Sequence, residues 1–333
     1  MDLPLPKLSM YWAASCGGCE MALLSLDEHL LTLHEAFDLV FCPCLIDTKK
    51  RDIEAMQDGE IAITLFNGGI RSSEDEEMAR LLRQKSKLLI AFGSCACEGC
   101  VPGLANLAAA QECLDSSYLS CPTTKNEGAI VPRAETFVPE GTLELPQLCS
   151  RLRTLSDVVD VDYFIPGCPP ESHRLLDVVR LITSGETLPP KGSILGAGIS
   201  TVCIECPRCR GEKRLARFHR LHTLLPESGI CLVDQGVVCM GLATRDGCGA
   251  KCPKAGMPCS GCYGAPEGVQ DQGAKMVSAL APLIDIGDTE SLGEDEIARR
   301  IDAALDTLPD PVGTFYKYSL AASVLKGTLR EAD

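Results

Sequence analysis

Apolar residues in the first half of the chain form short continuous runs separated by stretches with helical spacing. The runs are dense in Leu, Ile, Val and Phe and predict β-strands at residues 8–12, 37–45, 61–66, 87–92 and 158–165. Between them, apolar positions recur every three or four residues, which predicts helices at 21–33, 72–85, 104–119 and 171–184. Strands that are apolar throughout and alternate with helices are typical of a parallel sheet covered on both faces. We therefore expect an α/β fold, with residues 120–150 as a long loop rich in Pro, Gly and Thr.

Cysteines follow three of these predicted strands directly. They are Cys16 and Cys19 in Cys-Gly-Gly-Cys-Glu, Cys95 in Gly-Ser-Cys-Ala, and Cys168 in Pro-Gly-Cys-Pro-Pro. Parallel sheets bind ligands at the carboxyl ends of their strands, so these four thiols, the proximal set, are expected at one edge. A redox dithiol, a zinc half-site and an iron–sulfur half-site all use Cys-x-x-Cys. Four thiolates from three separate segments favour one iron–sulfur cubane, with zinc as the alternative.

The second half of the chain has a different composition. Beyond Pro189-Pro190 the strand-like runs fade and cysteines crowd at positions 203, 206, 209, 231, 239, 248, 252, 259 and 262. With Pro and Gly between them, these residues cannot build much apolar core, so metal ligation is the expected source of order. Helices are predicted at 273–283 and 294–305. The sequence thus predicts two domains, 1–187 and 188–333.

Composition narrows the possible surroundings of the protein. The chain has 333 residues, a net charge of −15 and twenty cysteines. The acidic balance argues against nucleic acid as the main partner. No export signal is recognisable, and no run approaches the ~18 apolar residues of a membrane span. We therefore expect a cytoplasmic protein, in which clustered cysteines are metal ligands rather than disulfides.

The order of these motifs identifies a resemblance that covers roughly residues 8–320. Cys-Gly-Gly-Cys-Glu, Gly-Ser-Cys-Ala and Pro-Gly-Cys-Pro-Pro, followed by a cysteine-rich tail, resemble the small, electron-transferring subunit of nickel–iron hydrogenases. The resemblance implies a flavodoxin-like N-terminal domain whose proximal set (Cys16, Cys19, Cys95 and Cys168) holds the proximal cluster. It also implies a distal set, Cys203, Cys206, Cys231 and Cys239, and a medial set, Cys248, Cys252, Cys259 and Cys262.

Two departures from many respiratory relatives refine the resemblance. In those relatives a proline occupies one ligand position of the medial cluster, where this chain has Cys252, so a four-iron medial cluster is expected. A histidine is a ligand of the distal cluster in those relatives, where this chain has Cys203. The closest subgroup is then the cytoplasmic hydrogenase associated with heterodisulfide reductase in methanogenesis, which does not reduce coenzyme F-420. Cys209 departs from the family pattern and leaves open a shift of the distal set by one ligand.

The resemblance implies three 4Fe-4S clusters, with no nickel, flavin or nucleotide in this chain. A partner large subunit would carry nickel–iron and oxidise dihydrogen, and electrons would leave to an iron–sulfur adaptor and a heterodisulfide reductase. The alternatives are the small subunit of an NAD(P)-linked sulfhydrogenase and a non-catalytic iron–sulfur carrier. Cys42 and Cys44 are expected to be small buried apolar residues, whereas Cys97 and Cys100 are possible competitors for the proximal cluster.

Overall fold

A computed structural model of the chain describes residues 4–211, 214–287 and 291–327. Internal contacts divide it into two compact units. The first runs to Leu195 and also includes the described residues from Leu320 onward, and the second is Gly196–Ser319. The end of the described chain groups with the sheet-containing unit, where Asn106 Nδ2 donates to the Lys326 carbonyl over 3.2 Å.

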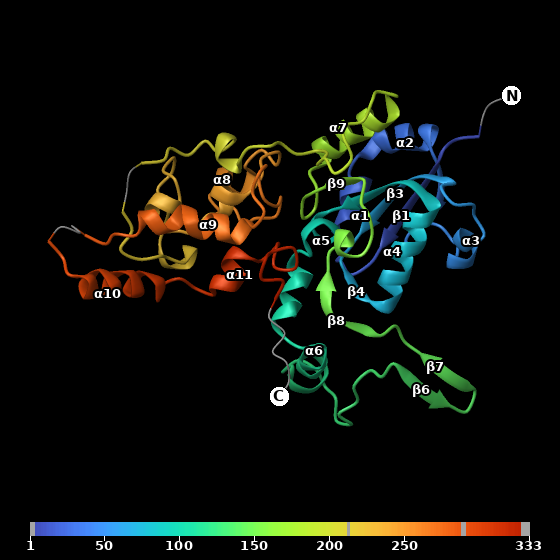
Figure 1. The fold of residues 1–333 in the computed structure, drawn as a ribbon, viewed down its shortest axis with the longest axis horizontal. Helices are drawn as coiled ribbons and strands as arrows, with labels where there is room; N and C mark the ends of the chain where they lie inside the picture. The colour runs from blue at the N-terminus through green and yellow to red at the C-terminus, as the bar shows by residue number, and fades with distance from the viewer. Residues whose placement is uncertain (1–3, 212–213, 288–290, 328–333) are drawn as a thin grey trace. The chain divides into compact units, whose positions relative to one another are not determined.

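The first unit is built on a five-stranded parallel sheet, in the order β2-β1-β3-β5-β9 (Figure 1). The strands are β1 (Lys7–Trp12), β2 (Asp38–Phe41), β3 (Ile61–Asn67), β5 (Ser86–Phe92) and β9 (Tyr163–Ile165). Counting only these five strands, the order is 2-1-3-4-5, that of flavodoxin-like folds. The predicted α/β class with a flavodoxin-like sheet is confirmed.

Helices cover both faces of this sheet, as the apolar strands require. One face carries α1 (Gly18–Leu24), α2 (Leu30–Ala36) and α7 (Ser172–Thr183), and the other carries α3 (Lys50–Glu54) and α4 (Ser73–Lys85). Helix α4 begins as predicted, because Ser72 accepts a hydrogen bond from the Asp75 backbone N–H and Asp75 accepts one in return.

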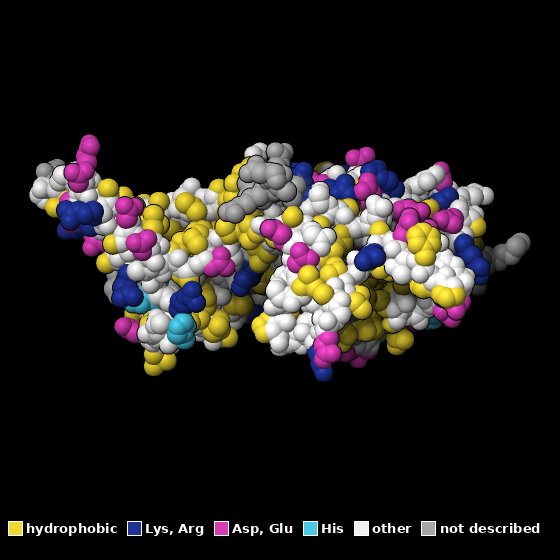
Figure 2. Space-filling view, turned by 90° about the horizontal axis from the view of Figure 1, so that it is seen from below, with side chains coloured by type: hydrophobic (Ala, Val, Ile, Leu, Met, Phe, Trp, Pro, Cys, Tyr) yellow, Lys and Arg dark blue, Asp and Glu magenta, His cyan; other side chains and the backbone are white. Residues whose placement is uncertain are grey.

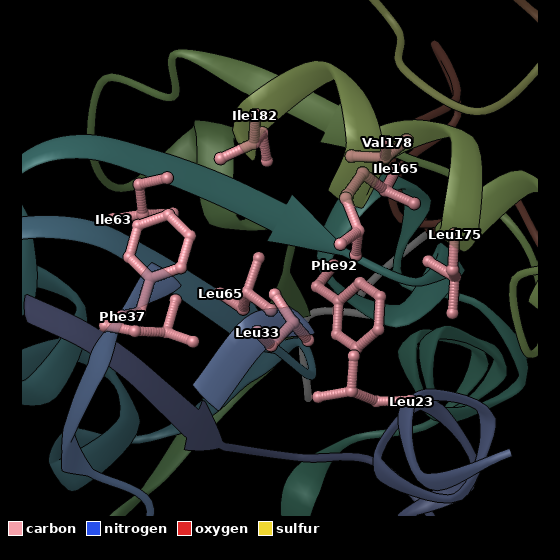
Figure 3. Close-up of a pocket in the computed structure, with 12 residues that line it drawn as sticks. Leu23, Leu33, Phe37, Ile63, Leu65, Phe92, Ile165, Leu175, Val178 and Ile182 are labelled. Atoms are coloured by element: carbon pink, nitrogen blue, oxygen red, sulfur yellow. The ribbon is translucent and has the colours of Figure 1, made fainter. Parts of the chain in front are cut away.

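Side chains of the sheet and of helices α1, α2 and α7 form an apolar core (Figure 3). A cavity of about 40 Å³ remains within it, and only apolar residues line it. Figure 3 shows Phe92 and Ile165 from the sheet pointing toward Leu175 and Val178 of α7. With no polar group to orient a ligand, this cavity is part of the core rather than a binding site.

Several predicted elements are shorter or more broken than expected. The helix at 21–33 is divided by a 3-10 turn, Asp27–His29, where Asp27 adopts φ +50°. The strands at 37–45 and 158–165 are reduced to β2 and β9. Because β2 ends at Phe41, Cys44 lies beyond it and is exposed, so the prediction that Cys44 is buried is wrong, whereas Cys42 is buried. The helix at 104–119 is replaced by three short segments: Val101–Leu107 (3-10), α6 (Ala110–Asp115) and Ser116–Ser120 (π).

The predicted loop at 120–150 contains strands that the apolar pattern does not predict. Strands β6 (Glu135–Val138) and β7 (Gly141–Glu144) form an antiparallel hairpin. Strand β8 (Leu148–Arg153) pairs with β4 (Ile70–Ser72). The hairpin residues are almost all exposed, so burial imposes no alternation of apolar and polar positions on them.

The second unit consists of short helical turns and loops. Its longer helices are α9 (Gln272–Leu280) and α10 (Glu294–Leu305), close to prediction, and its shorter ones are α8 (Lys251–Lys254) and α11 (Pro311–Phe315). Further 3-10 turns lie at Leu155–Asp157 in the first unit, and at Val202–Ile204, Leu221–Thr223, Val233–Gln235, Met240–Ala243 and Ala281–Leu283 in the second. Cysteines, Cys259 among them, pack within the core of the second unit. Across the described residues, no helix has the length and apolarity to span a membrane.

Candidate functional site

Strand register brings the proximal set to one edge of the sheet. Trp12 of β1 pairs with Asn67 of β3, Asn67 pairs with Phe92 of β5, and Phe92 pairs with Ile165 of β9. These four residues end their strands, so the segments that follow start from the same level. Helix α1 and the short helix α5 (Ser94–Glu98) therefore begin at this edge, beside the end of β9 (Figure 1).

Backbone hydrogen bonds fix the segment that carries Cys95 against the one that carries Cys168. The Gly93 N–H donates to the Ile165 carbonyl over 2.8 Å, and the Ser94 N–H donates to the Gly167 carbonyl over 2.8 Å. In return, the Gly167 N–H donates to Ser94 Oγ over 3.1 Å. Two segments more than seventy residues apart are thus held together directly beside their cysteines.

The four thiols of the proximal set are electrostatic neighbours. Burial raises the pKa of the Cys19 thiol well above its usual value, and Cys95, Cys168 and Cys16 raise it further as adjacent negative groups. These surroundings keep the Cys19 thiol protonated until a positively charged group arrives. Iron binding requires thiolates, so loading the site would release protons. The donor set and its electrostatics fit a cluster held by four cysteines.

Gly93 leaves room for a sulfur atom at this edge. It adopts φ +82°, and a β-carbon placed on it would lie 2.2 Å from Cys19 Sγ and 3.7 Å from Asn67 Oδ1. Any side chain there would displace the thiol of Cys19. The backbone therefore forms a cradle that brings this thiol close to the start of α5.

Asn67 was not singled out from the sequence, although it is central to the site. It is fully buried at the end of β3, and its Nδ2 donates to both carboxylate oxygens of Glu20 over 2.7 and 2.8 Å. Its Oδ1 is buried without a hydrogen-bond partner in the described part of the chain. An orphaned buried acceptor marks a place where something beyond these residues is needed. The feature of the sequence that indicates Asn67 is its position, a polar residue at the end of an otherwise apolar strand.

Two further thiols lie beside the proximal set. Cys97 is directed away from it, with its thiol donating to the carbonyls of Ala91 over 3.5 Å and Ile165 over 3.7 Å. Cys100 is directed into it: hydrogen bonds to Cys168 and Cys95, followed by burial, raise the pKa of the Cys100 thiol far above its usual value. The same contact lowers the pKa of Cys168 to about 7.

In the second unit, the thiols of the distal set are neighbours of one another. Burial raises the pKa of Cys203, and Cys231 and Cys206 add to the effect. Burial likewise raises the pKa of Cys239 to about 11, with Cys203 and Cys231 again contributing. Cys209 is adjacent through the backbone, because the Cys231 N–H donates to its carbonyl over 2.8 Å.

The medial set lies partly against the distal set. The Cys259 N–H donates to Cys239 Sγ over 3.2 Å, and the thiol of Cys259 is also a neighbour of Cys262. Cys248 and Cys252 flank the start of α8. Within the loop of Cys248, the N–H groups of Gly247 and Gly249 donate to Glu205 Oε2 over 3.1 and 2.9 Å, which ties that loop to the segment of the distal set.

Across the described residues, no three His, Cys, Asp or Glu side chains lie close enough together to hold a single metal ion. A cubane makes a different demand, since each of its four irons binds its own thiolate at a separate corner.

Comparisons with known proteins point to one class. A family described as "NADH ubiquinone oxidoreductase, 20 Kd subunit" matches residues 16–182. The iron–sulfur subunit of the F420-non-reducing hydrogenase of Archaeoglobus profundus is 33% identical over 328 residues, 97% of this chain and 98% of that protein. The corresponding F420-non-reducing hydrogenase subunit of Methanothermobacter marburgensis is 35% identical over 322 residues, 96% of each chain. A crystal structure of an NAD+-reducing [NiFe]-hydrogenase is 28% identical, with a TM-score of 0.47 over 56% of this chain and 96% of that one.

Sequence and relatives together define an iron–sulfur component of an oxidoreductase that acts on dihydrogen. More particularly, the chain belongs to the family of nickel–iron hydrogenase small subunits, in which the nickel–iron active site is in the large subunit. The resemblance indicated by the cysteine motifs is confirmed at the level of this family.

Proposed function

We propose that this chain carries electrons from dihydrogen oxidation in the large subunit, through three 4Fe-4S clusters, to an iron–sulfur adaptor and a heterodisulfide reductase. The proximal set would hold one cluster in the first unit, and the medial and distal sets would hold two in the second. The convergence of Cys16, Cys19, Cys95 and Cys168 at the carboxyl edge of the sheet carries this proposal. When bound, such clusters take up and release one electron at a time.

The protein's contribution is to hold and tune the sulfur ligands. Backbone N–H groups directed at sulfur favour the reduced, more negative state of a cluster. The Cys259 N–H has this role toward Cys239, whose thiol it reaches over 3.2 Å. Because this pair joins the proposed medial and distal sets, it also gives the electron a short covalent and hydrogen-bonded connection between them.

Charge supports an acidic electron acceptor beside the distal set. The whole chain has a net charge of −15, yet four exposed arginines follow Cys209: Arg210, Arg214, Arg217 and Arg220. Their segment is tied to the loop between Cys231 and Cys239, because the His219 N–H donates to the Gly236 carbonyl over 2.7 Å. Figure 2 shows basic and histidine side chains near one another on the lower part of this unit, on the left. Complementary charge would orient an acidic partner there.

Cysteine usage supports a reducing compartment, and we propose the cytoplasm. The sequence has twenty cysteines, and we propose twelve of them as cluster ligands. Thiolates that bind iron need an environment that prevents disulfide formation.

Anaerobic purification of the chain with its large subunit tests the proposal. Metal analysis should give about twelve irons per small subunit, from three cubanes, and nickel in the large subunit. The Cys168→Ser variant should lose about four of these irons, because each cubane depends on its thiolates. Cys42→Ser is the matched control, since Cys42 is buried in the apolar core of the same unit and should keep all twelve.

Zinc in place of iron, or an equal loss in both variants, would contradict the proposal. The subunits that co-purify identify the acceptor. A heterodisulfide reductase supports the proposed route, whereas a flavin-nucleotide subunit would replace it with an NAD(P)-linked one.

A further inference from the structure

One short segment of the second unit is bonded to loops of both proposed cluster sites there. It runs from Cys203 to Cys209, and besides three cysteines it contains Glu205 and Arg208. Both charged residues are half-buried, and their side chains bond to backbone groups of other loops. Hydrogen bonds that involve a charged group are short and directional, so each of these side chains fixes the loop that it reaches.

Arg208 joins the loop of Cys252 to the loop of Cys231. Its Nε donates to the carbonyl of Pro253, directly after Cys252, over 3.0 Å. Its Nη1 donates to the carbonyl of Ile230, directly before Cys231, over 2.9 Å. The guanidinium is planar and presents its donors in a rigid fork, so it holds these two loops at a fixed separation.

Glu205 joins the same segment to the loop of Cys248. Its Oε2 accepts hydrogen bonds from the N–H groups of Gly247 and Gly249, on either side of Cys248, over 3.1 and 2.9 Å. The loops of two cysteines of the medial set, Cys248 and Cys252, are therefore fixed to a segment that carries cysteines of the distal set.

Regular structure contributes little to the order of these loops. Between Gly196 and Cys262, the helical elements of the described chain are 3-10 turns and the four-residue helix α8. Metal ligation is then the main source of order, and the binding free energy at each site includes the cost of ordering its loops. Loops that serve both sites need to be ordered only once, so loading one site lowers the cost of loading the other.

We propose that the medial and distal sites load with iron–sulfur clusters cooperatively, and that Arg208 is the positioning residue that couples them. This inference rests on the proposed function, because it needs two clusters in the second unit. Arg208 acts through the carbonyls beside Cys231 and Cys252 and is itself no ligand.

Two variants and a control of the complete hydrogenase, purified anaerobically, test this role. Arg208→Gln removes the charge and the fork. Arg208→Lys keeps the charge, but a single ammonium group cannot reproduce the fork that spans two loops. Lys254→Gln is the matched control, because Lys254 follows Pro253 in the same loop and is exposed, so a positive charge is removed without a bond between loops among the described residues.

The measurement is the loss of iron to a chelator added in graded amounts. Native mass spectrometry counts the irons left in each complex, and electron paramagnetic resonance of the reduced protein identifies the clusters that remain. We expect that loading one site raises the affinity of the other about tenfold in the wild type and in Lys254→Gln, so the two clusters are lost together. In both Arg208 variants this factor should fall to about one to two, and molecules with one of the two clusters should accumulate.

Cooperativity separates this role from a general loss of stability. A second unit that is merely destabilised would bind both clusters more weakly without uncoupling them. The proximal cluster is the internal reference, since its ligands belong to the first unit and its loss should be the same in all four proteins.

Independent loss of the two clusters in the wild type would overturn the inference, and so would unchanged cooperativity in Arg208→Gln. Full cooperativity in Arg208→Lys would also overturn it, because a charge without the fork would then suffice. If Arg208→Gln fails to load the second unit, Arg208→Lys decides alone. Wild-type protein with iron in the first unit only would instead refute the proposed function, so the two failures are distinguishable.

Discussion

Replacing Gly93 by alanine tests directly whether the sheet edge is shaped around the sulfur of Cys19. The new β-carbon would lie 2.2 Å from Cys19 Sγ, whereas carbon–sulfur contacts need well over 3 Å. The thiol would have to move by about 1 Å, and a ligand constellation tolerates displacements of only about 0.5 Å. We therefore expect Gly93→Ala to lose the proximal cluster.

The same substitution has a second effect that must be separated from the first. Gly93 adopts φ +82°, and a β-carbon in such a conformation costs about 1–3 kcal/mol of folding stability. Gly185, at the end of α7, has a similar φ of +74°, but a β-carbon there would meet nothing within 4 Å. Gly185→Ala therefore places a β-carbon at a positive φ without displacing a thiol.

Iron analysis and thermal unfolding of the two variants, purified anaerobically, separate these effects. Both variants should lose about 1–3 kcal/mol of stability from the backbone strain. Only Gly93→Ala should fall from about twelve to about eight irons and lose the spectroscopic signal of the proximal cluster. Full iron and an unchanged signal in Gly93→Ala would show that the cradle at Gly93 does not position the Cys19 thiol.

Three further predictions concern stability. Burial opposes the charge of Asp162, but hydrogen bonds from Lys191 and Arg83 hold its pKa below the usual value. The charged carboxylate therefore stabilises the fold fully above about pH 4, and this stabilisation is lost as the pH falls through the lowered pKa. Asp162→Asn should lower the free energy of unfolding, measured with urea at pH 7, by about 3 kcal/mol, and should make the loss of stability at acid pH less steep. Ser72→Ala should cost about 1 kcal/mol in the same assay, because Ser72 caps α4. Anaerobic removal of iron should increase hydrogen exchange more in Gly196–Ser319 than in the sheet, whose core contains few cysteines; equal exchange would contradict it.

The sequence was sufficient where a local pattern has one physical solution. The apolar runs within β3 (Ile61–Asn67) and β5 (Ser86–Phe92) are buried on both faces, and a covered parallel sheet provides that burial. Cysteines directly after such strands must then meet at the carboxyl edge. For this reason the fold class and the convergence of the proximal set follow from the sequence alone.

Local patterns did not predict secondary structure correctly where a segment is exposed, or where its contacts come from residues distant in the sequence. The hairpin β6–β7 is exposed, so nothing in its sequence distinguishes it from a loop. The helix predicted at 104–119 breaks into short segments, and within it Asn106 bonds to the backbone of Leu152 and Lys326, which are distant in sequence. Such partners override helical spacing because a buried amide must be satisfied.

The sequence by itself determined which thiols stand at the strand ends, because the spacing of apolar runs and cysteines is a property of the chain. Only the tertiary structure decided the direction of each neighbouring side chain. Cys97 and Cys100 are equivalent in the sequence, yet one bonds to backbone carbonyls and the other to the proximal set. That difference depends on where β5, β9 and the turn after α5 lie in space, and no local pattern contains it.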